Sequence, residues 1–353
     1  MRVLVDGYIY GRSRFGGMVR YFDSLIRELS NRGYYVGLLL THEIADHPSL
    51  PLTKEFVQTI VTTANTSSSE WDVLLASPSS DASVRARRTI LTVHDLIDEL
   101  HPELVDESSR FAGGTAPGLS ETVRRADCIV AISQATKDDL LRYCDSPPGE
   151  ITVVHHGADA AFLRPAHCFQ DDSLHVLNRL GITKPYILVV GGRHGYKNVL
   201  KALTAYGTSG SADAYAFVAV GSQTTYSDEE RDIIDRLRLD NVLLTGYIGD
   251  VDLARLYSST SLFIMPSLLE GFGLPVLEAM ACGAPVACST TPALVEIGGG
   301  IPVFFDGTSV DAIAAGMKQA LQNYPRSRRK RGREHARKFR WVDTVDKLSV
   351  LFS

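Results

Sequence analysis

The chain has 353 residues, enough for about two domains of ordinary size, and 44% of them are hydrophobic while 22% are charged. This is the composition of an ordinary globular protein, and a formal net charge of −5 argues against a general affinity for nucleic acid. The five cysteines contain no CxxC pair, so we expect neither a disulfide framework nor a zinc site. No apolar run approaches the ~20 residues that cross a bilayer, and a strand-like run begins at Arg2, so we expect a cytoplasmic protein without a signal peptide.

The first half of the chain alternates strand-like and helical runs. Residues 2–6 read as a short apolar strand, and Val19, Phe22 and Leu25 recur at helical spacing within residues 18–29. Further short apolar runs, typical of strands, follow at 34–40, 72–77, 88–95, 128–133 and 151–157. Polar or helical sequence follows each run, which is the pattern of repeated strand–helix units.

The same pattern restarts after residues 164–173, which read RPAHCFQDDS. Strand-like runs lie at 186–192, 216–221, 241–246, 261–267, 284–289 and 301–306. Continuously apolar strands between helical segments indicate parallel sheets with helices on both faces. We therefore predict an α/β protein with two doubly wound, Rossmann-like domains, residues 1–165 and 174–338, facing each other across a cleft. Ligands of such sheets bind at the carboxyl ends of the strands, which would line that cleft.

One stretch in the second half, EGFGLPVLEAMACG at residues 270–283, combines two glycines with two carboxylates. Pro275 suits the first position of a helix and Gly283 its end, so Glu270 lies in a loop between a strand and a helix N-terminus. Such an N-terminus favours a phosphate, because its amides are unpaired and it is the positive pole of the helix dipole. Carboxylates beside an anion site make sense where the ligand also carries hydroxyls. A sugar joined to a nucleoside diphosphate has hydroxyls at both ends and the anion between them.

Two other interpretations of this stretch stay open. Gly271 and Gly273 begin like the GxGxxG motif of dinucleotide-binding proteins, but Val276 stands at the third glycine position and the motif lies deep in the chain. The stretch could also be a glycine-rich turn in which the glutamates have no role in binding.

The stretch resembles the EX7E motif of retaining GT-B glycosyltransferases, specifically glycosyltransferase family four, and the resemblance extends over nearly the whole chain. The most specific match is the continuous run at residues 245–286. Shorter matches occur in the order expected of the family: FGGMVRY (15–21), TVHDL (92–96) with HPE (101–103), AISQATKDDL (131–140) and GGRHGYKN (191–198). The resemblance implies the GT-B fold and a last helix, within residues 339–353, that returns to the N-terminal domain.

The resemblance also implies roles for residues that match the family. Glu278 would bind the ribose hydroxyls, and Glu270 would bind the transferred sugar. Arg193 and Lys197 would neutralise the diphosphate, whose charge grows as it leaves. The remaining expected contacts are the amides of Phe272, Gly273 and Leu274 at the sugar and phosphates, Gly16 and Gly17 at the donor phosphate, His94 at the donor sugar, and Tyr247 and Ile248 along the base.

The chemistry implied by the resemblance is the transfer of a hexose from a nucleoside-diphosphate sugar with retention of configuration. No cofactor is expected, and no metal, since no DxD pair is placed to bind one. The run TVHDLIDELHPEL (92–104) resembles bacterial polysaccharide mannosyltransferases, so GDP-mannose is the first expected donor and a UDP-sugar the second. The expected acceptor is a saccharide or a lipid-linked saccharide in cell-surface polysaccharide synthesis.

Other functions remain open at this stage. Asp95 could serve as the base of an inverting enzyme. The fold is also used by sugar-nucleotide epimerases and phosphorylases, and a two-domain sugar-nucleotide binding protein could keep the cleft without the chemistry.

Two segments bear on the acceptor and on the membrane. Residues 105–123 are small, flexible and acidic-leaning where the family often carries a basic and aromatic helix, which puts membrane docking through that segment in doubt. Residues 326–340 contain nine Arg or Lys and one Glu. They could form a solvated helical face, or a peripheral dock for anionic lipid at the inner face of the membrane.

Overall fold

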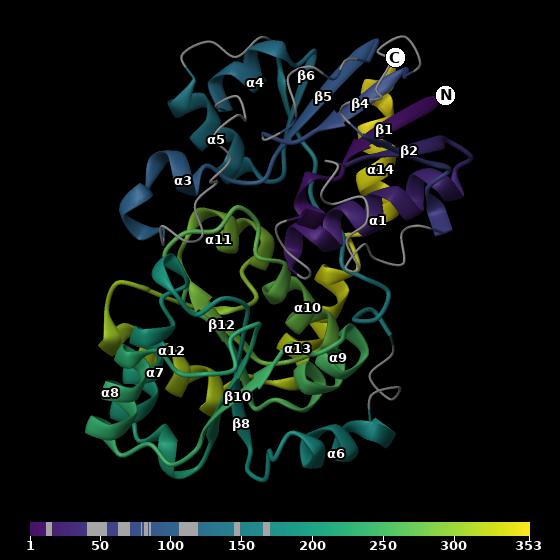
Figure 1. Cartoon of the computed structure of the whole chain (residues 1–353). Coiled ribbons are helices and arrows are strands. Elements are labelled where there is room, and N and C mark those ends of the chain that lie inside the picture. Colours follow the sequence, from purple (N-terminus) through teal and green to yellow (C-terminus); the bar gives the residue numbers. More distant parts are fainter. Residues whose placement is uncertain are drawn as a thin grey trace. The chain divides into compact units, whose positions relative to one another are not determined.

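A computed structural model of the chain describes residues 1–11, 16–40, 55–62, 71–78, 80, 84, 86–105, 119–144, 149–164 and 170–353 (Figure 1). The chain forms two compact units. Unit 1 comprises Met1–Leu100, Ser109–Gly157 and Phe339–Ser353, and unit 2 comprises His101–Ser108 and Ala158–Lys338. The units are described separately below.

The described residues of unit 1 form a seven-stranded sheet in the order β3-β2-β1-β4-β5-β6-β7, and every pair of neighbours is parallel. The strands are β1 (Arg2–Asp6), β2 (Tyr35–Leu40), β3 (Thr59–Thr62), β4 (Val73–Ala76), β5 (Arg88–Val93), β6 (Cys128–Ala131) and β7 (Ile151–Val153). The helices are α1 (Gly17–Asn31), α3 (Ile97–Leu100), α4 (Leu119–Arg125), α5 (Gln134–Tyr143) and α14 (Trp341–Ser349), with 3-10 turns η1 (Tyr8–Gly11) and η9 (Val350–Phe352).

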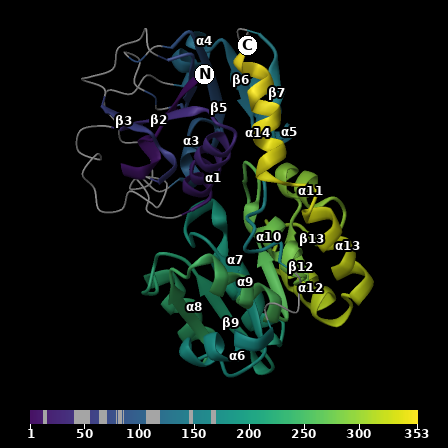
Figure 2. The same cartoon turned by 90° about the vertical axis from the view of Figure 1, so that its right-hand side faces the viewer.

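Strand β1 shows why this sheet is covered on both faces. Val3, Leu4 and Val5 are all fully buried. Because successive side chains of a strand point to opposite faces, Val3 and Val5 enter the core made with α1 and α14, whereas Leu4 enters the core on the other face. Helix α14, yellow in Figure 2, is the last helix of the chain and packs against α1.

The described residues of unit 2 form a six-stranded parallel sheet in the order β10-β9-β8-β11-β12-β13. The strands are β8 (Tyr186–Val190), β9 (Ala216–Val220), β10 (Val242–Gly246), β11 (Leu262–Met265), β12 (Val286–Ser289) and β13 (Val303–Phe305). The helices are α6 (Gln170–Arg179), α7 (Val199–Thr208), α8 (Asp228–Leu237), α9 (Asp250–Ser259), α10 (Leu274–Cys282), α11 (Pro292–Gly298), α12 (Val310–Gln322) and α13 (Arg326–Ala336), with 3-10 turns η5 (Pro102–Leu104), η7 (Gly195–Lys197) and η8 (Ser211–Asp213). Helices α7, α8 and α12 contribute to one apolar core with the sheet, while α10 packs against α9 and α13.

The predicted α/β class with two parallel, Rossmann-like sheets is confirmed. The boundaries predicted near residue 165 differ from the units, since 158–164 group with unit 2. The reason is packing: the Phe162 ring meets the Tyr257 ring edge-on at 5.9 Å, and the Phe162 carbonyl accepts a hydrogen bond from the thiol of Cys282 at 3.7 Å. Residues 101–105 also group with unit 2, where the Leu104 carbonyl lies against Gly195.

Parts of three predicted features lie outside the described residues. These are Phe15 of the FGGMVRY run, residues 106–118 of the 105–123 segment, and residues 165–169 of the predicted linker. Within the part of the chain that is described, no helix has both the length and the apolar character needed to span a membrane.

Candidate functional site

Two loops of unit 2 begin at the centre of its sheet. Strands β8 and β11 are neighbours, but the chain runs outward from β8 to β9 and β10 and, in the other direction, from β11 to β12 and β13. In a doubly wound sheet, such a reversal opens a crevice at the carboxyl ends of the two strands, where ligands bind. Loop 191–198 follows β8 and loop 266–273 follows β11, so both predicted motifs of this unit reach that crevice.

Backbone and amide hydrogen bonds hold the two loops together. The amide N–H of Leu268 donates to the carbonyl of Tyr196 at 2.7 Å. The side-chain Nδ2 of Asn198 donates to the carbonyls of Pro266 at 2.9 Å and Gly307 at 2.8 Å. Asn198 is buried and has φ 58°, a left-handed conformation that asparagine tolerates better than most residues. It therefore fixes the position of the preceding residue, Lys197.

Lys197 and Glu270 come together across these loops. The Nζ of Lys197 lies 2.7 Å from Oε1 of Glu270, and the side chains are 26% and 9% exposed. The same Nζ lies 4.9 Å from the centre of the Tyr196 ring, which attracts a cation. The structure thus brings two of the predicted site residues into one ion pair at the carboxyl edge of the sheet. A lysine ammonium can donate to a phosphate, and a carboxylate can accept from hydroxyls.

Helix α10 begins directly after loop 266–273. Its N-cap is Gly273, no side chain caps this end, and a proline stands in its first turn. Gly273 has φ 99°, and a Cβ there would overlap the side chain of Leu294, so only glycine fits this turn. Phe272 and Leu274, whose amides the resemblance assigns to the sugar and phosphates, have buried side chains that anchor the same turn. The positive pole of the helix dipole therefore lies three residues after Glu270.

Glu278 lies inside α10 and is 1% exposed. The phenol of Tyr257, on α9, donates a hydrogen bond to its Oε2 at 3.2 Å. A buried carboxylate requires polar partners, and Tyr257 supplies one. Nearer the edge of the sheet, the loop after β10 carries Tyr247, which is 48% exposed, and Ile248, which is buried. Ile248 therefore packs inside unit 2, while the ring of Tyr247 lies at the surface.

The placement of Arg193 differs from the role that the resemblance implies. Its side chain is 2% exposed, and its Nε donates to Oε1 of Glu230 at 2.7 Å. The two terminal nitrogens donate to the carbonyls of Gln223 at 2.8 Å and Thr225 at 2.6 Å. Glu230 also accepts from the backbone N–H of Ser227 in the capping box of α8. The guanidinium therefore ties loop 191–198 to the start of α8.

In unit 1, the predicted glycines mark the start of α1. Gly16 is the N-cap of this helix and Gly17 its first residue, and no side chain caps this end. Helix α1 follows β1, which neighbours β4 at the point where the strand order of this sheet reverses. By the same rule as in unit 2, this helix N-terminus lies at the ligand-binding edge of its sheet.

His94 follows β5 and is buried, 8% exposed. Its Nε2 is buried and has no hydrogen-bond partner among the described residues. Its ring meets the Tyr21 ring edge-on at 4.9 Å. Burial lowers the pKa of His94 to about 4, so the ring is neutral near pH 7. The neighbouring Asp95 accepts from the backbone N–H of Ile97 at 3.2 Å, a contact at the start of α3.

Several residues that support the site were not identified from the sequence. Asn198 and Tyr257 were missed because their partners lie 68 and 21 positions away in the chain. In unit 1, His156 stacks on Tyr21 with ring centres 4.8 Å apart and lies 5.4 Å from the Trp341 ring. Asn198 stands at the end of the GGRHGYKN match, which was the one local signal for it. No three His, Cys, Asp or Glu side chains of the described residues gather closely enough to hold a metal ion.

The two halves of the chain match two family profiles. The profile described as Glycosyltransferase Family 4 matches residues 15–162, and the one described as Glycosyl transferases group 1 matches residues 176–339. The junction between the profiles coincides with the segment that joins the two strand–helix series.

Among curated relatives, the chain is 29% identical over 269 residues to O-antigen chain mannosyltransferase B of Escherichia coli. The alignment covers 73% of this chain and 68% of that protein. It is 28% identical over 268 residues to serotype-specific mannosyltransferase WbdA of Escherichia coli, with 73% of this chain and 32% of that protein covered. The chain thus spans about a third of WbdA. A solved structure of Anabaena Alr3699/HepE in complex with UDP-glucose matches with a TM-score of 0.77 and 17% identity over 99% of this chain and 98% of that one, which supports the fold alone.

Proposed function

The chain belongs to the family-four-like glycosyltransferases with the GT-B fold, and we propose that it transfers a hexose from a nucleoside-diphosphate sugar to a saccharide or glycolipid acceptor. The proposed setting is the synthesis of a cell-surface polysaccharide, which is supported by the similarity to an O-antigen mannosyltransferase.

The observation that carries this proposal is the Lys197–Glu270 pair beside the N-terminus of α10. A nucleoside-diphosphate sugar has a diphosphate between two groups of hydroxyls. Lys197 and the positive helix pole would bind the diphosphate, and Glu270 would accept hydrogen bonds from the transferred sugar. Glu278, further along α10, would accept from the ribose hydroxyls, with Tyr257 holding its carboxylate in place.

In the proposed reaction, the bond from the anomeric carbon to the donor phosphate oxygen breaks, and the nucleoside diphosphate leaves with the electron pair. The acceptor hydroxyl bonds to the anomeric carbon on the same face, so the configuration is retained. Its proton passes to an oxygen of the departing phosphate, and no protein base is required. Negative charge grows on the diphosphate during this step, and the ammonium of Lys197 counters it.

We propose that this transfer needs no metal ion. The positive pole of α10 and the Lys197 ammonium already supply charge that a divalent cation would otherwise bring to the diphosphate. Arg193 has no part in this proposal as a ligand of the diphosphate, because its guanidinium is committed to Glu230 and two carbonyls.

GDP-mannose is the proposed donor, with support from the two Escherichia coli mannosyltransferases. A UDP-sugar is the second candidate, because the Anabaena structure of the same fold holds UDP-glucose. The two candidates share the diphosphate and differ in the base and the sugar, so the Lys197–Glu270 pair does not discriminate between them.

Thermal denaturation with GDP, UDP, ADP and their sugar conjugates tests the proposal. A ligand at 100 times its dissociation constant stabilises the folded protein by ~2.7 kcal/mol, so the preferred nucleotide should stand out as a clear rise in Tm. Transfer to an acceptor saccharide is then measured with the preferred sugar nucleotide. An absence of stabilisation by any nucleoside diphosphate would contradict the proposed function, and conversion of the donor without an acceptor would favour an epimerase.

A further inference from the structure

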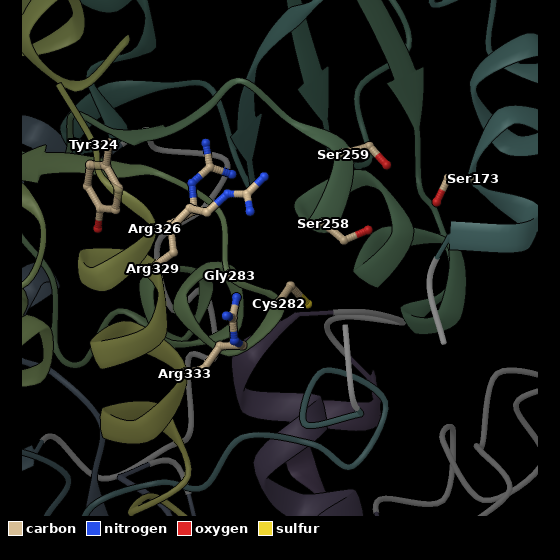
Figure 3. A pocket seen from close by; sticks show the side chains of 9 residues that line it. All are labelled: Ser173, Ser258, Ser259, Cys282, Gly283, Tyr324, Arg326, Arg329 and Arg333. Atoms are coloured by element: carbon tan, nitrogen blue, oxygen red, sulfur yellow. The ribbon is translucent and has the colours of Figure 1, made fainter. Parts of the chain in front are cut away.

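The basic run at residues 326–340 does not form a uniform charged surface. Most of it folds as α13, and Arg326, Arg329 and Arg333 recur on one side of this helix at helical spacing. These three arginines line a cavity of about 630 Å³ in unit 2 (Figure 3). The other lining residues are Ser173, Ser258, Ser259, Cys282, Gly283 and Tyr324.

Some of the other basic residues of the run have protein partners. Arg328 donates to the carbonyls of Ile301 and Pro302, and Lys330 pairs with Glu334 at 3.8 Å. The Arg328 contacts hold α13 against the rest of unit 2, the Lys330–Glu334 pair lies within α13, and together they account for two of its charges without any ligand.

The three arginines of the cavity have no such partner among the described residues. None of their guanidinium groups makes a hydrogen bond or an ion pair with any residue in the described part of the chain. Burial lowers the pKa of Arg329; the neighbouring Tyr324 opposes this shift, while the positive charges of Arg333 and Arg326 add to it. Three cations therefore repel one another around the same cavity, and no Asp or Glu is among the described residues that line it.

The C-terminal ends of two helices supply only part of the negative charge that would neutralise the three arginines. Ser258 and Ser259 end α9, Cys282 ends α10, and Arg333 lies directly over Gly283. Each helix C-terminus carries about −0.5 of an elementary charge, so the two ends contribute about −1 against three guanidinium groups. The helix ends therefore do not neutralise the three guanidinium groups, and the net positive charge that remains suits an anion such as a phosphate monoester, which carries about −2 near neutral pH.

The cavity has room and hydroxyl groups for more than inorganic phosphate. Figure 3 shows the guanidinium groups of Arg326 and Arg329 side by side, with Ser258 and Ser259 across from them. A volume of about 630 Å³ lies in the range typical of small-molecule sites. The cavity is separate from the Lys197–Glu270 site, because it lies at the C-terminal end of α10, a nine-residue helix about 14 Å long, and that site lies before its N-terminal end.

We propose that this cavity is a second ligand site that binds a phosphate monoester of sugar-phosphate size through Arg326, Arg329 and Arg333. Guanidinium groups bind phosphate oxygens through paired hydrogen bonds, and the serine hydroxyls suit the polar remainder of a sugar. The phosphate can come from a soluble sugar phosphate or from a lipid headgroup, which present the same chemistry to the arginines.

The test compares two triple variants that remove equal charge from residues 326–337. Arg326→Gln, Arg329→Gln and Arg333→Gln remove the cavity arginines, whereas the control, Lys330→Gln, Arg331→Gln and Arg337→Gln, removes exposed charges outside the cavity. Thermal denaturation is measured with glucose 6-phosphate and with inorganic phosphate, at an ionic strength matched by KCl. At ten times its dissociation constant a ligand should raise Tm by roughly 2 °C. We expect this rise in wild type, in the control triple variant and in Lys197→Gln, and its loss in the cavity variant.

Two further measurements sharpen the test. Without phosphate, the cavity variant should be at least as stable as wild type, because it relieves repulsion between the arginines. A clear drop in Tm would mean that the arginines are structural caps of α9 and α10.

Co-sedimentation with phosphatidylcholine vesicles containing phosphatidic acid, a phosphomonoester lipid, tests the second source of phosphate. Binding of the vesicles alone, lost in the cavity variant, would assign the site to a lipid headgroup. The proposal fails if wild type responds to neither source, or if both triple variants lose the response equally.

Discussion

The ammonium of Lys197 meets the carboxylate of Glu270 at 2.7 Å, although the two residues lie 73 positions apart in the chain. The contact joins the loop after β8 to the loop after β11 at the point where the strand order reverses. Each side chain holds the other in the crevice where a sugar nucleotide would bind.

Lys197→Ala should lower the rate of sugar transfer by about a hundredfold. A single group that counters charge in the transition state contributes roughly 3 kcal/mol in comparable sites. Steady-state kinetics with the preferred sugar nucleotide measures this, and Lys201→Ala, at a partly buried lysine on α7, serves as the control. Full activity in Lys197→Ala would remove this loop from the diphosphate site.

The two glutamates should differ in what they do to nucleotide binding. Glu278→Ala should weaken the binding of the free nucleoside diphosphate, because ribose contacts are made equally in the ground state and the transition state. Glu270→Ala should lower turnover but leave that affinity unchanged or tighter, since it removes the carboxylate that now holds the Lys197 ammonium. Isothermal titration calorimetry with the free diphosphate separates the two. An equal loss of affinity in both variants would contradict this division of the ligand.

Chelation of metal ions should leave transfer intact. The diphosphate would be neutralised by Lys197 and by the N-terminus of α10, so excess EDTA should change the rate by less than about twofold. Loss of activity that Mg²⁺ or Mn²⁺ restores would show that the lysine and the helix are insufficient.

The free energy of unfolding should fall as the pH is lowered, and His94 should account for part of this fall. Burial lowers its pKa from 6.5 to about 4, so between these values the unfolded chain binds a proton that the folded protein does not. Stability from this residue is therefore complete above about pH 6.5 and is lost as the pH falls toward 4, with a maximum effect on the order of 3 kcal/mol. His94→Gln should show a shallower fall over this window in urea unfolding curves. His101→Gln, at a half-exposed histidine, is the control, and identical slopes for wild type and His94→Gln would contradict the burial effect.

The fold could be predicted from the sequence because its signals are local. Apolar strands such as β8 and β11 alternate with helical segments, and Pro275 and Gly283 mark the two ends of α10. Strand β3 was missed, because this edge strand has only partly buried or exposed residues and thus lacks the apolar pattern.

The pairing of charges in the site could not be predicted in the same way. Arg193 and Lys197 lie four residues apart in one loop and look equally suited to a diphosphate. What separates them is Glu230, 37 positions after Arg193, which reads locally as an ordinary capping residue of α8. The cavity beside α13 could not be predicted either. Helical spacing places the three arginines on one side of the helix, but the cavity also needs the ends of α9 and α10, which lie elsewhere in the chain.

The ion pair between Arg193 and Glu230 gives the sharpest contrast between resemblance and structure. Arg193→Met should destabilise the protein by ~3–5 kcal/mol, because it leaves the Glu230 carboxylate buried without its cation. Adding Glu230→Gln should recover much of this loss, since the amide is neutral and its oxygen can still accept from the backbone N–H of Ser227. The double variant should then bind the nucleoside diphosphate and transfer sugar at close to the wild-type rate. If the double variant is stable but a hundredfold slower, Arg193 acts on the diphosphate after all, and the loop must rearrange when the donor binds. Chemical denaturation followed by steady-state kinetics on the same three proteins, the Arg193 variant, the double variant and wild type, distinguishes these outcomes.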